Sequence, residues 1–260
     1  MIVRNPPWPG PQAERQSPGP RVKLGSLIPT MAPGHPYVRI ADLTVVYRSG
    51  AGHEVEAVQS VTMDLPRGRF VALAGPSGSG KSSMLYVLAG LLRPTRGTVS
   101  VDNNDLTSMS ADQLARYRCA NVGFIFQSFQ LLPHLSAWEN VALPMIPLGV
   151  TASQRRTRAC KQLSSIGLGA RITHKPGELS AGEQQRVAIA RAVINSPTLV
   201  LADEPTGNLD AANAALVADE MERLVRDLGA TVVCATHDER VASRAQVVAR
   251  MDHGRLVEQS

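Results

Sequence analysis

A glycine-rich segment, GPSGSGKS, runs from Gly75 to Ser82. It fits the pattern G-x-x-x-x-G-K-[ST] and lies between an apolar run at 70–74 and a helix predicted over 81–92, which is the context this pattern needs. In such a loop the backbone N–H groups converge on phosphate oxygens, and the next helix directs its positive end at the same anion. Lys81 would neutralise the β- and γ-phosphates, and the Ser82 hydroxyl would ligate Mg²⁺. The segment therefore predicts a nucleoside triphosphate site, with a simple Gly-Ser turn as the alternative.

An acidic pair, Asp203 and Glu204, follows a second apolar run at 199–202. A buried strand that ends in carboxylates places them at the carboxyl edge of a parallel sheet, where phosphate-binding loops also lie. There Asp203 can hold Mg²⁺ through water, and Glu204 can polarise an attacking water as general base. A solvated turn is the alternative. The nucleotide-binding residues predicted in the glycine-rich loop are Gly75, Pro76, Ser77, Gly78, Ser79, Gly80, Lys81, Ser82 and Ser83.

A third segment, LSAGEQQR at 179–186, precedes the acidic pair by about twenty residues. It contains the spacing S-x-x-E between Ser180 and Glu183, which predicts a capping box at a helix start. The free N–H groups of such a start can face a phosphate. An ordinary helix start is the alternative.

These segments together resemble the ATP-binding cassette (ABC) family, whose signature is LSGGQ followed by a basic helix. The family order is phosphate loop, Q-loop glutamine, signature, acid pair, D-loop and switch histidine. Here these positions are Lys81, Gln127, Ser180, Asp203 with Glu204, Asp210 and His237. The resemblance covers residues 37–260, and it implies an enzyme that hydrolyses ATP with Mg²⁺.

The resemblance also implies roles for residues that their surroundings alone leave open. Gln127 would sense Mg²⁺ and the attacking water, although a glutamine at a strand end is commonly structural. His237 would contact the γ-phosphate. Tyr47 would stack under adenine, or pack on its own sheet. Ser180 and Gly182 would face the phosphate.

The resemblance implies a head-to-tail dimer, in which each ATP lies between the phosphate loop of one chain and the signature of the other. The chain departs from the signature pattern at two positions, where Ala181 replaces glycine and Glu183 replaces glutamine. Glu183 preserves the reciprocal hydrogen bonds of a capping box. Ala181 adds a methyl group where the backbone would approach the γ-phosphate.

Strands and helices alternate along most of the chain, which predicts an α/β fold with a mostly parallel sheet. The resemblance implies a P-loop NTPase fold with a RecA-like core, an antiparallel β subdomain, and an inserted α-helical subdomain at about 128–186. The strands are predicted at 38–47, 61–65, 70–74, 199–202 and 231–235, with a turn at Ser49–Gly52. Helices are predicted at 81–92, 111–118, 151–166 and 182–194.

The N-terminal segment 1–36 differs in composition from the rest of the chain. It holds nine of the eighteen prolines, and its charged residues sum to +3 of the overall net charge of +5. We predict a disordered tail ahead of an ABC domain at 37–260. The alternative is that Met31 is the true start. Because the domain itself carries only +2, the basic pI does not indicate a nucleic-acid partner.

The segment after Gln127, SFQLLPHLSAWENV, contains Leu131, Leu132, Leu135 and Trp138. In ABC transporters this region receives a short helix of the membrane subunit, so these side chains are either an apolar notch for that helix or the core of the subdomain. The chain resembles the branch of lipoprotein-release ATPases, macrolide exporters and the cell-division ATPase that controls wall hydrolases. The resemblance lies in the segments FIFQSFQLLPHLSAWENVALP and LADEPTGNLD.

Other classes of ATPase fit the chain less well. Gln127 and Leu179 are 52 positions apart, too close for the coiled-coil insertion of a chromosome-maintenance ATPase, and only one cassette is present, unlike in translation factors. The 23 residues after His237 lead us to expect no regulatory domain. The run Arg155-Arg156-Thr157-Arg158 is interpreted as a solvated helix face, with a patch for lipid or nucleic acid as the alternative.

The sequence therefore predicts the ATPase subunit of a membrane transporter, or else a regulator of a wall hydrolase that acts through a membrane partner. We expect a homodimer, or a heterodimer with a second ATPase subunit, bound to an integral-membrane permease at the cytoplasmic face of the membrane. No run of apolar residues approaches the length of a membrane-spanning helix. The three cysteines lack metal-site or disulfide spacing and are typical of a reducing compartment.

Overall fold

The computed structural model describes residues 36–48, 53–207 and 211–260, with 211–213 described in backbone only. The predicted disordered tail, the turn at Ser49–Gly52 and Asp210 lie outside these residues, apart from Pro36. From Pro36 onward the described chain belongs to one structural unit.

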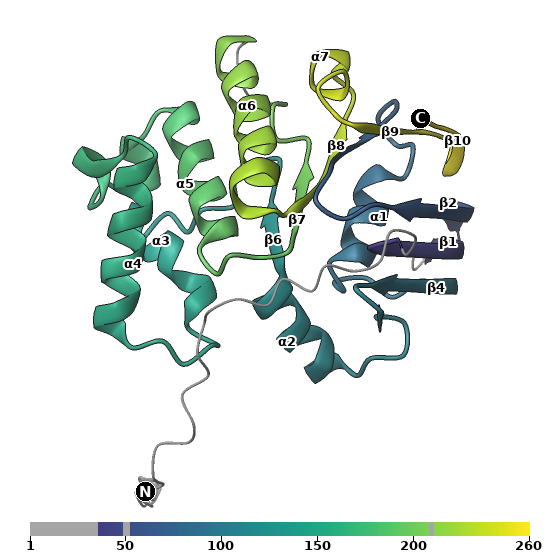
Figure 1. The fold of residues 1–260 in the computed structure, drawn as a ribbon, viewed down its shortest axis with the longest axis horizontal. Coiled ribbons are helices and arrows are strands. Elements are labelled where there is room, and N and C mark those ends of the chain that lie inside the picture. Colours follow the sequence, from purple (N-terminus) through teal and green to yellow (C-terminus); the bar gives the residue numbers. More distant parts are fainter. Residues whose placement is uncertain (1–35, 49–52, 208–210) are drawn as a thin grey trace, which may run out of the picture. The chain divides into compact units, whose positions relative to one another are not determined.

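A six-stranded sheet forms the centre of this unit, in the order β10-β9-β3-β8-β7-β6 (Figure 1). Strands β9, β3, β8, β7 and β6 run parallel, and only β10 is antiparallel to its neighbour. The runs at β3, β7 and β8 are buried along their whole length, as continuous apolar strands covered on both faces should be. The bounds are β3 Phe70–Ala74, β6 Val122–Ile125, β7 Leu199–Asp203, β8 Thr231–Thr236, β9 Val247–Asp252 and β10 Arg255–Gln259.

A second, antiparallel sheet has the order β2-β1-β4-β5. Val38 in β1 pairs with Leu65 of β2 on one side and with Val101 of β4 on the other. The inward side chains of this sheet share one apolar cluster with α1 and with one face of the parallel sheet. The bounds are β1 Val38–Arg48, β2 Glu54–Leu65, β4 Arg96–Val101 and β5 Asn104–Asp105.

Helices cover both faces of the parallel sheet. Helix α1, Lys81–Leu88, lies between the two sheets and contacts β7 and β8. On the opposite face α6, Ala211–Leu228, packs Val217 and Met221 into a second apolar cluster with Phe70 of β3. The remaining helices of this part are α2 Ala111–Asn121 and α7 Glu239–Ala242.

A group of helices between β6 and β7 has an apolar cluster of its own. It consists of α3 Ala137–Ala142, α4 Ala152–Ser165 and α5 Ala181–Val193, joined by the 3₁₀ turns η1 Leu143–Met145, η2 Gly169–Arg171 and η3 Pro176–Glu178. Helix α5 packs Val187 on this cluster and Ile189 on the cluster beneath the parallel sheet. The boundary predicted near 186 therefore falls inside a helix that belongs to both regions.

Three sequence-based predictions of local structure need correction. The helix predicted over 81–92 ends at Leu88, because Gly90 adopts a φ of +63° in the left-handed region, a conformation that ends helices. The strand predicted at 61–65 begins at Glu54, since pairing with β1 extends the hairpin well beyond its buried half. No helix was expected at 211–228, where α6 forms.

Candidate functional site

The glycine-rich loop passes close to the backbone of two neighbouring segments. A Cβ at Gly75 would lie 2.1 Å from the carbonyl oxygen of Met251, and one at Gly80 would lie 2.2 Å from that of Ala57. Gly80, at a φ of +97°, is also the residue before α1, and no side chain caps this helix start. Glycine is therefore required twice here, and the first N–H groups of α1 remain available to an anion.

Lys81 is the most deeply buried cation of this site, at 4% exposure. Its Nζ donates to the carbonyl oxygens of Gly75, at 2.9 Å, and Pro76, at 2.8 Å, and lies 3.8 Å from Oε1 of Glu204. The ammonium group is thus held inside the loop by two carbonyls and one carboxylate. A phosphate entering the loop would meet a cation already in place.

Ser82 and Asp203 join the start of α1 to the end of β7. The Ser82 hydroxyl donates to Oδ1 of Asp203 at 2.8 Å, and the Tyr86 hydroxyl donates to Oδ2 at 3.4 Å. Burial raises the pKa of Asp203, and the hydrogen bond from Ser82 opposes that shift. A hydroxyl and a carboxylate at this distance are hard oxygen donors of the kind that Mg²⁺ accepts alongside phosphate oxygens, so these residues fit the predicted ion.

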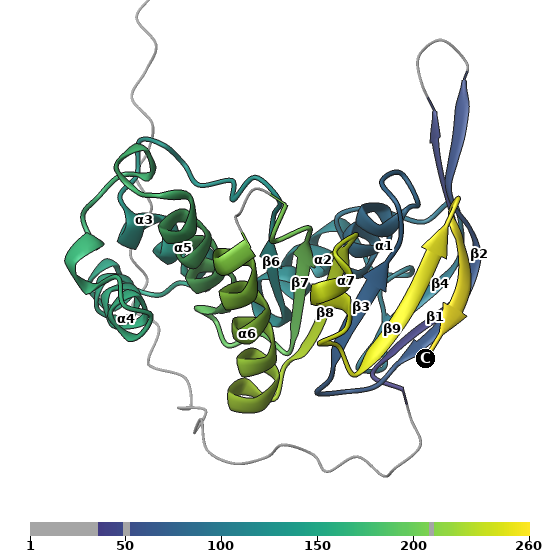
Figure 2. The ribbon, with the colours of Figure 1, turned by 90° about the horizontal axis from the view of Figure 1, so that it is seen from above.

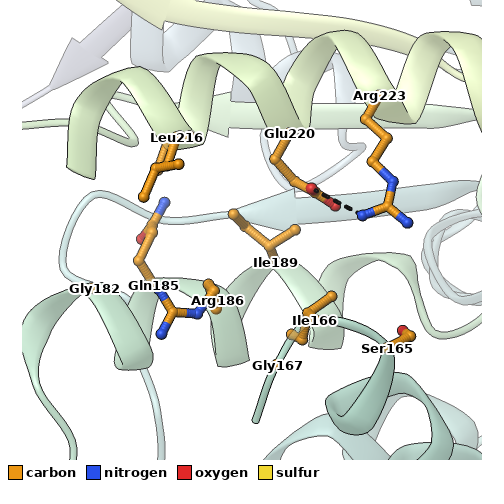
Figure 3. A pocket seen from close by; sticks show the side chains of 11 residues that line it. Ser165, Ile166, Gly167, Gly182, Gln185, Arg186, Ile189, Leu216, Glu220 and Arg223 are labelled. Carbon is orange, nitrogen blue, oxygen red and sulfur yellow. Dashed lines mark ion pairs between the residues drawn. The ribbon is translucent and has the colours of Figure 1, made fainter. Parts of the chain in front are cut away.

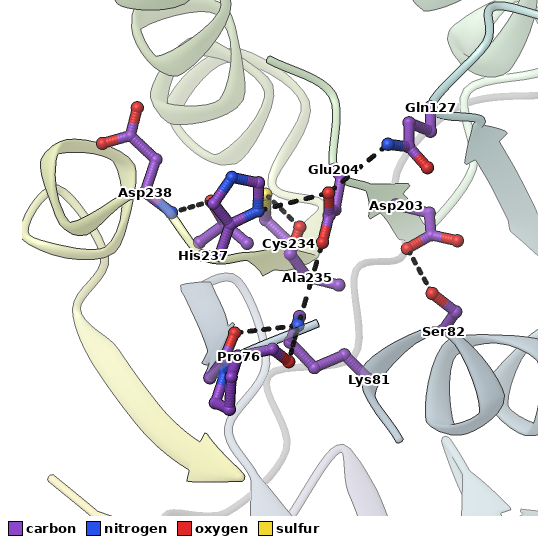
Figure 4. A network of polar contacts seen from close by, with 12 residues as sticks. Pro76, Lys81, Ser82, Gln127, Asp203, Glu204, Cys234, Ala235, His237 and Asp238 are labelled. Atoms are coloured by element: carbon purple, nitrogen blue, oxygen red, sulfur yellow. Dashed lines mark hydrogen bonds and ion pairs between the residues drawn. The ribbon is translucent and has the colours of Figure 1, made fainter. Parts of the chain in front are cut away.

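Glu204 contacts three of the other predicted site residues (Figure 4). Its Oε2 accepts from Nε2 of Gln127 at 3.4 Å and lies 3.2 Å from Nδ1 of His237, while Oε1 faces Lys81. Its backbone has a φ of +43°, and its N–H donates to the carbonyl of Ala235 at 2.9 Å. The neighbours of Glu204 therefore hold the backbone of a non-glycine residue in the left-handed region. Backbone strain of this kind clusters at functional sites.

A hollow of about 260 Å³ opens beside His237, and Gly75, Pro76 and Asp238 also line it. The His237 side chain is 54% exposed, so solvent and ligands reach it. Asp238 accepts from the N–H of Arg240 and so begins α7. The hollow therefore places the glycine-rich loop and the histidine on the same opening.

Tyr47 lies next to the last residue of β1, close to the first turn of α1. Its hydroxyl lies 3.1 Å from Oγ of Ser83, and the side chain is 42% exposed. Part of the ring is therefore open to a ligand, and stacking on a base stays a prediction beside packing on the sheet.

Ser180 begins α5 with the predicted capping box. Its hydroxyl accepts from the N–H of Glu183, and Oε2 of Glu183 accepts from the N–H of Ser180 at 2.9 Å. Arg171 donates to Glu183 at 3.1 Å. The capping box predicted from sequence is confirmed. Helix α5, which Ser180 caps, packs on the edge strand β6, whereas α1 packs on β7 and β8 (Figures 1 and 2). Ser180 and Gly182 make no described hydrogen bond or ion pair to Lys81, Asp203 or Glu204.

In the segment after Gln127, some apolar side chains pack into the core of the helical group and another stays exposed, as an apolar notch would require. Leu131 and Trp138 are partly buried against the apolar cluster of the helical group, and the guanidinium of Arg156 lies 5.5 Å from the centre of the Trp138 ring. Leu132 is 40% exposed, in the turn that precedes α3.

Tyr86 and Arg191 contact site segments and were missed by sequence reasoning. Tyr86 follows Ser82 by one helical turn, and this i, i+4 spacing was the available signal that both face Asp203. Arg191 donates to the carbonyls of Phe129 and Gln130, and so ties α5 to the segment after Gln127.

Comparison with known proteins identifies the family. Residues 58–207, more than half of the chain, match the ABC transporter family. The chain belongs to this family. A solved dimeric ATP-binding cassette in a post-hydrolysis state with ADP and phosphate is similar over 86% of this chain and 97% of its own, with a TM-score of 0.79 and 37% identity. The chain is an ABC ATPase, and the predicted P-loop NTPase fold is confirmed.

Relatives of this ABC ATPase include subunits and larger proteins. It is 43% identical over 220 residues to the lipoprotein-releasing system ATP-binding protein LolD of Geobacter metallireducens, which covers 85% of this chain and 97% of that protein. It is 41% identical over 225 residues to the macrolide export ATP-binding/permease protein MacB of Hyphomonas neptunium, covering 86% of this chain and only 35% of that protein. The predicted branch of the family is confirmed.

An uncharacterized ABC transporter ATP-binding protein of Thermotoga maritima is 42% identical over 219 residues, which is 84% of this chain and 93% of that protein. Within the part of the chain that the structure describes, no helix combines the length and the apolar character needed to cross a membrane.

Proposed function

We propose that this ABC ATPase is the ATP-hydrolysing subunit of a membrane transporter and drives a separate permease at the cytoplasmic face of the membrane. Its resemblance to LolD and MacB supports export or lipoprotein release as the driven process. The observation that carries the proposal is the contact network of Glu204, which joins Lys81, Gln127 and His237 at one carboxylate.

Glu204 is the proposed general base. A carboxylate accepts a proton from an attacking water, and Gln127 and His237 are within hydrogen-bonding reach of the same group, so they can orient that water. Lys81 supplies positive charge beside the γ-phosphate, where negative charge develops during phosphoryl transfer. The arrangement needs no covalent intermediate, since positioning and charge carry most of the rate in this chemistry.

Ser82 and Asp203 are the proposed holders of Mg²⁺, with Gln127 beside them. When bound, the ion neutralises the phosphate oxygens. Tyr47 is proposed to stack on the adenine, because an exposed aromatic face beside Ser83 offers a base stacking worth about 1–3 kcal/mol.

The working form is proposed to be a head-to-tail dimer with two composite sites. Within one chain, Ser180 lies on α5, away from the residues around Lys81, so a second chain is needed to bring a signature to each ATP. The dimeric cassette structures of relatives support this arrangement. The exposed Leu132, next to the Q-loop, is the proposed contact for an apolar helix of the permease.

The Glu204→Gln variant tests this function. It keeps the shape of the side chain but cannot accept a proton, so we expect ATP hydrolysis to fall by about 10²–10⁴-fold while ATP binding persists and dimers accumulate. Steady-state phosphate release, nucleotide titration and light scattering measure the three quantities.

Glu54→Gln, on the exposed part of β2, is the matched control and should hydrolyse ATP at the normal rate. Near-normal turnover in Glu204→Gln would contradict the role of Glu204.

A further inference from the structure

A pocket of about 500 Å³ lies between α5 and α6 (Figure 3). Ser165 at the end of α4 and the next two residues, Ile166 and Gly167, close one end of it. This volume is in the range of small-molecule pockets in proteins. Gly182, one of the two signature residues predicted to face a phosphate, lines the pocket at one end, and the other lining residues lie outside the predicted nucleotide site.

Gln185 presents an unsatisfied amide to this pocket. The side chain is 1% exposed, and neither its nitrogen nor its oxygen has a hydrogen-bond partner among the described residues. Figure 3 shows the amide extending from α5 toward Leu216 of α6. A buried amide without partners is costly, so a ligand that both donates to it and accepts from it is stabilised at this position.

The charges around the pocket favour an anionic group. Glu220 and Arg223, three positions apart on α6, form an ion pair with 3.7 Å between their charged groups, so their charges neutralise each other. Arg186 lines the pocket next to Gln185 and forms no ion pair with any described carboxylate. The pocket therefore holds one uncompensated positive charge beside the amide, and guanidinium groups pair with carboxylates in bidentate geometry.

The remaining wall is apolar. Ile166 and Ile189 lie opposite Leu216, and the Leu216 side chain is 58% exposed. A branched aliphatic group of about four carbons placed here would cover Leu216 and be removed from water, which favours binding.

We propose that this pocket binds a carboxylate-terminated amide with a branched apolar side chain, as found at the carboxyl terminus of a peptide that ends in leucine and in a free N-acyl leucine. The amide of the ligand pairs reciprocally with Gln185, its carboxylate pairs with Arg186, and its side chain packs on Ile189 and Leu216. Helix α5 belongs to the helical group and α6 to the core, so the bound ligand links the two regions.

N-acetyl-L-leucine is the probe, titrated into the full-length protein and followed by calorimetry and by the side-chain NH₂ signals in ¹⁵N-resolved NMR. We expect saturable binding that shifts the signal of Gln185. Gln185→Met, which removes only the amide, should weaken binding at least about tenfold. Gln162→Met, on α4 and outside the pocket, is the matched control and should bind as the parent protein does.

Arg186→Gln gives a second, independent readout. The parent protein should prefer N-acetyl-L-leucine to N-acetyl-L-leucinamide, and Arg186→Gln should lose this preference. An acetylated tripeptide ending in leucine separates the two sources of the ligand, since a peptide terminus predicts tighter binding of the tripeptide and a free amino-acid derivative predicts tighter binding of the small probe.

Two results would overturn the proposal. One is the absence of binding by the parent protein to both probes at concentrations up to about 10 mM, well above the weakest affinities of specific ligands. The other is unchanged binding in folded Gln185→Met and Arg186→Gln, with folding verified by thermal melting. Either result would leave Gln185 as an unsatisfied buried group without a ligand.

Discussion

Two helix starts in this protein are predicted to meet phosphate, and they are built in opposite ways. Helix α1 begins at Gly80 without a side-chain cap, and Lys81 beside it is buried among loop carbonyls. Helix α5 begins at Ser180 with a complete capping box, on an exposed part of the surface. The first start leaves its N–H groups for a ligand, while the second uses its own side chains to satisfy part of the helix end.

The difference indicates that the two helix starts have different roles in nucleotide binding. The α1 start has a buried cation and open N–H groups, so it can hold a nucleotide within one chain. The α5 start carries Glu183, whose pKa is lowered chiefly by the hydrogen bond from the backbone of Ser180. A negative charge at this end opposes a phosphate, so α5 is better suited to complete a site than to bind nucleotide alone.

The largest effect is expected at the α1 start. Lys81→Ala removes the buried cation, and we expect nucleotide affinity and turnover to fall by about 100-fold or more, as for the loss of a preorganised charge in other active sites. Fluorescent-nucleotide titration and phosphate release measure both. Lys161→Ala, an exposed lysine on α4, is the control. Unchanged nucleotide affinity in Lys81→Ala would contradict the claim that the α1 start binds nucleotide with its buried cation.

At the α5 start, Ser180→Asp separates capping from phosphate contact. Aspartate caps a helix as well as serine does, so stability should hold, whereas Ser180→Ala should cost about 1 kcal/mol. Turnover should fall at least about tenfold in Ser180→Asp, because its charge would face a phosphate. Nucleotide binding to the dilute monomer should be normal. Full turnover in Ser180→Asp would mean that Ser180 is only a cap.

The Asp203→Asn variant tests how much the buried, charged carboxylate of Asp203 lowers the stability of the folded protein. Burial raises the pKa of this carboxyl, so the folded protein loses stability as pH rises through that raised value. Asp203→Asn avoids the loss and keeps an acceptor for Ser82. We expect its nucleotide-free form to melt a few degrees higher at neutral pH, at about 2–4 °C per kcal/mol, and the gain to vanish below the ordinary pKa of 3.8. A lower melting temperature at pH 7 would contradict this.

The smallest effect is expected from Glu183→Gln. Glutamine keeps the capping box but removes a carboxylate whose pKa is lowered, so turnover should rise by about two- to fivefold, the size of a single charge effect at a helix end. Glu178→Gln, in the neighbouring turn, is the control. Reduced turnover in Glu183→Gln would show that the negative charge supports the signature.

The sequence predicts motif residues and buried strands well, because both depend on local pattern. Ser180 caps α5 through residues three positions away, so its role could be predicted from the sequence. Gln185 lies five positions later within the same motif, but its isolation depends on how α6 packs across from it. Glu204 was found as an acid after a strand, yet its contact with His237 depends on the order of β7 and β8 in the sheet. Local rules do not supply these tertiary relations.

Mixing two inactive variants tests the central claim that each ATP site is shared between chains. Lys81→Ala lacks a working phosphate loop, and Ser180→Arg lacks a working signature. A heterodimer of the two contains one site in which both parts are intact, so an equal mixture should recover up to about a quarter of the normal ATPase rate, although each variant alone is inactive. A mixture that stays as inactive as its separate components, or a dilute monomer that hydrolyses ATP at the full rate, would contradict the shared site.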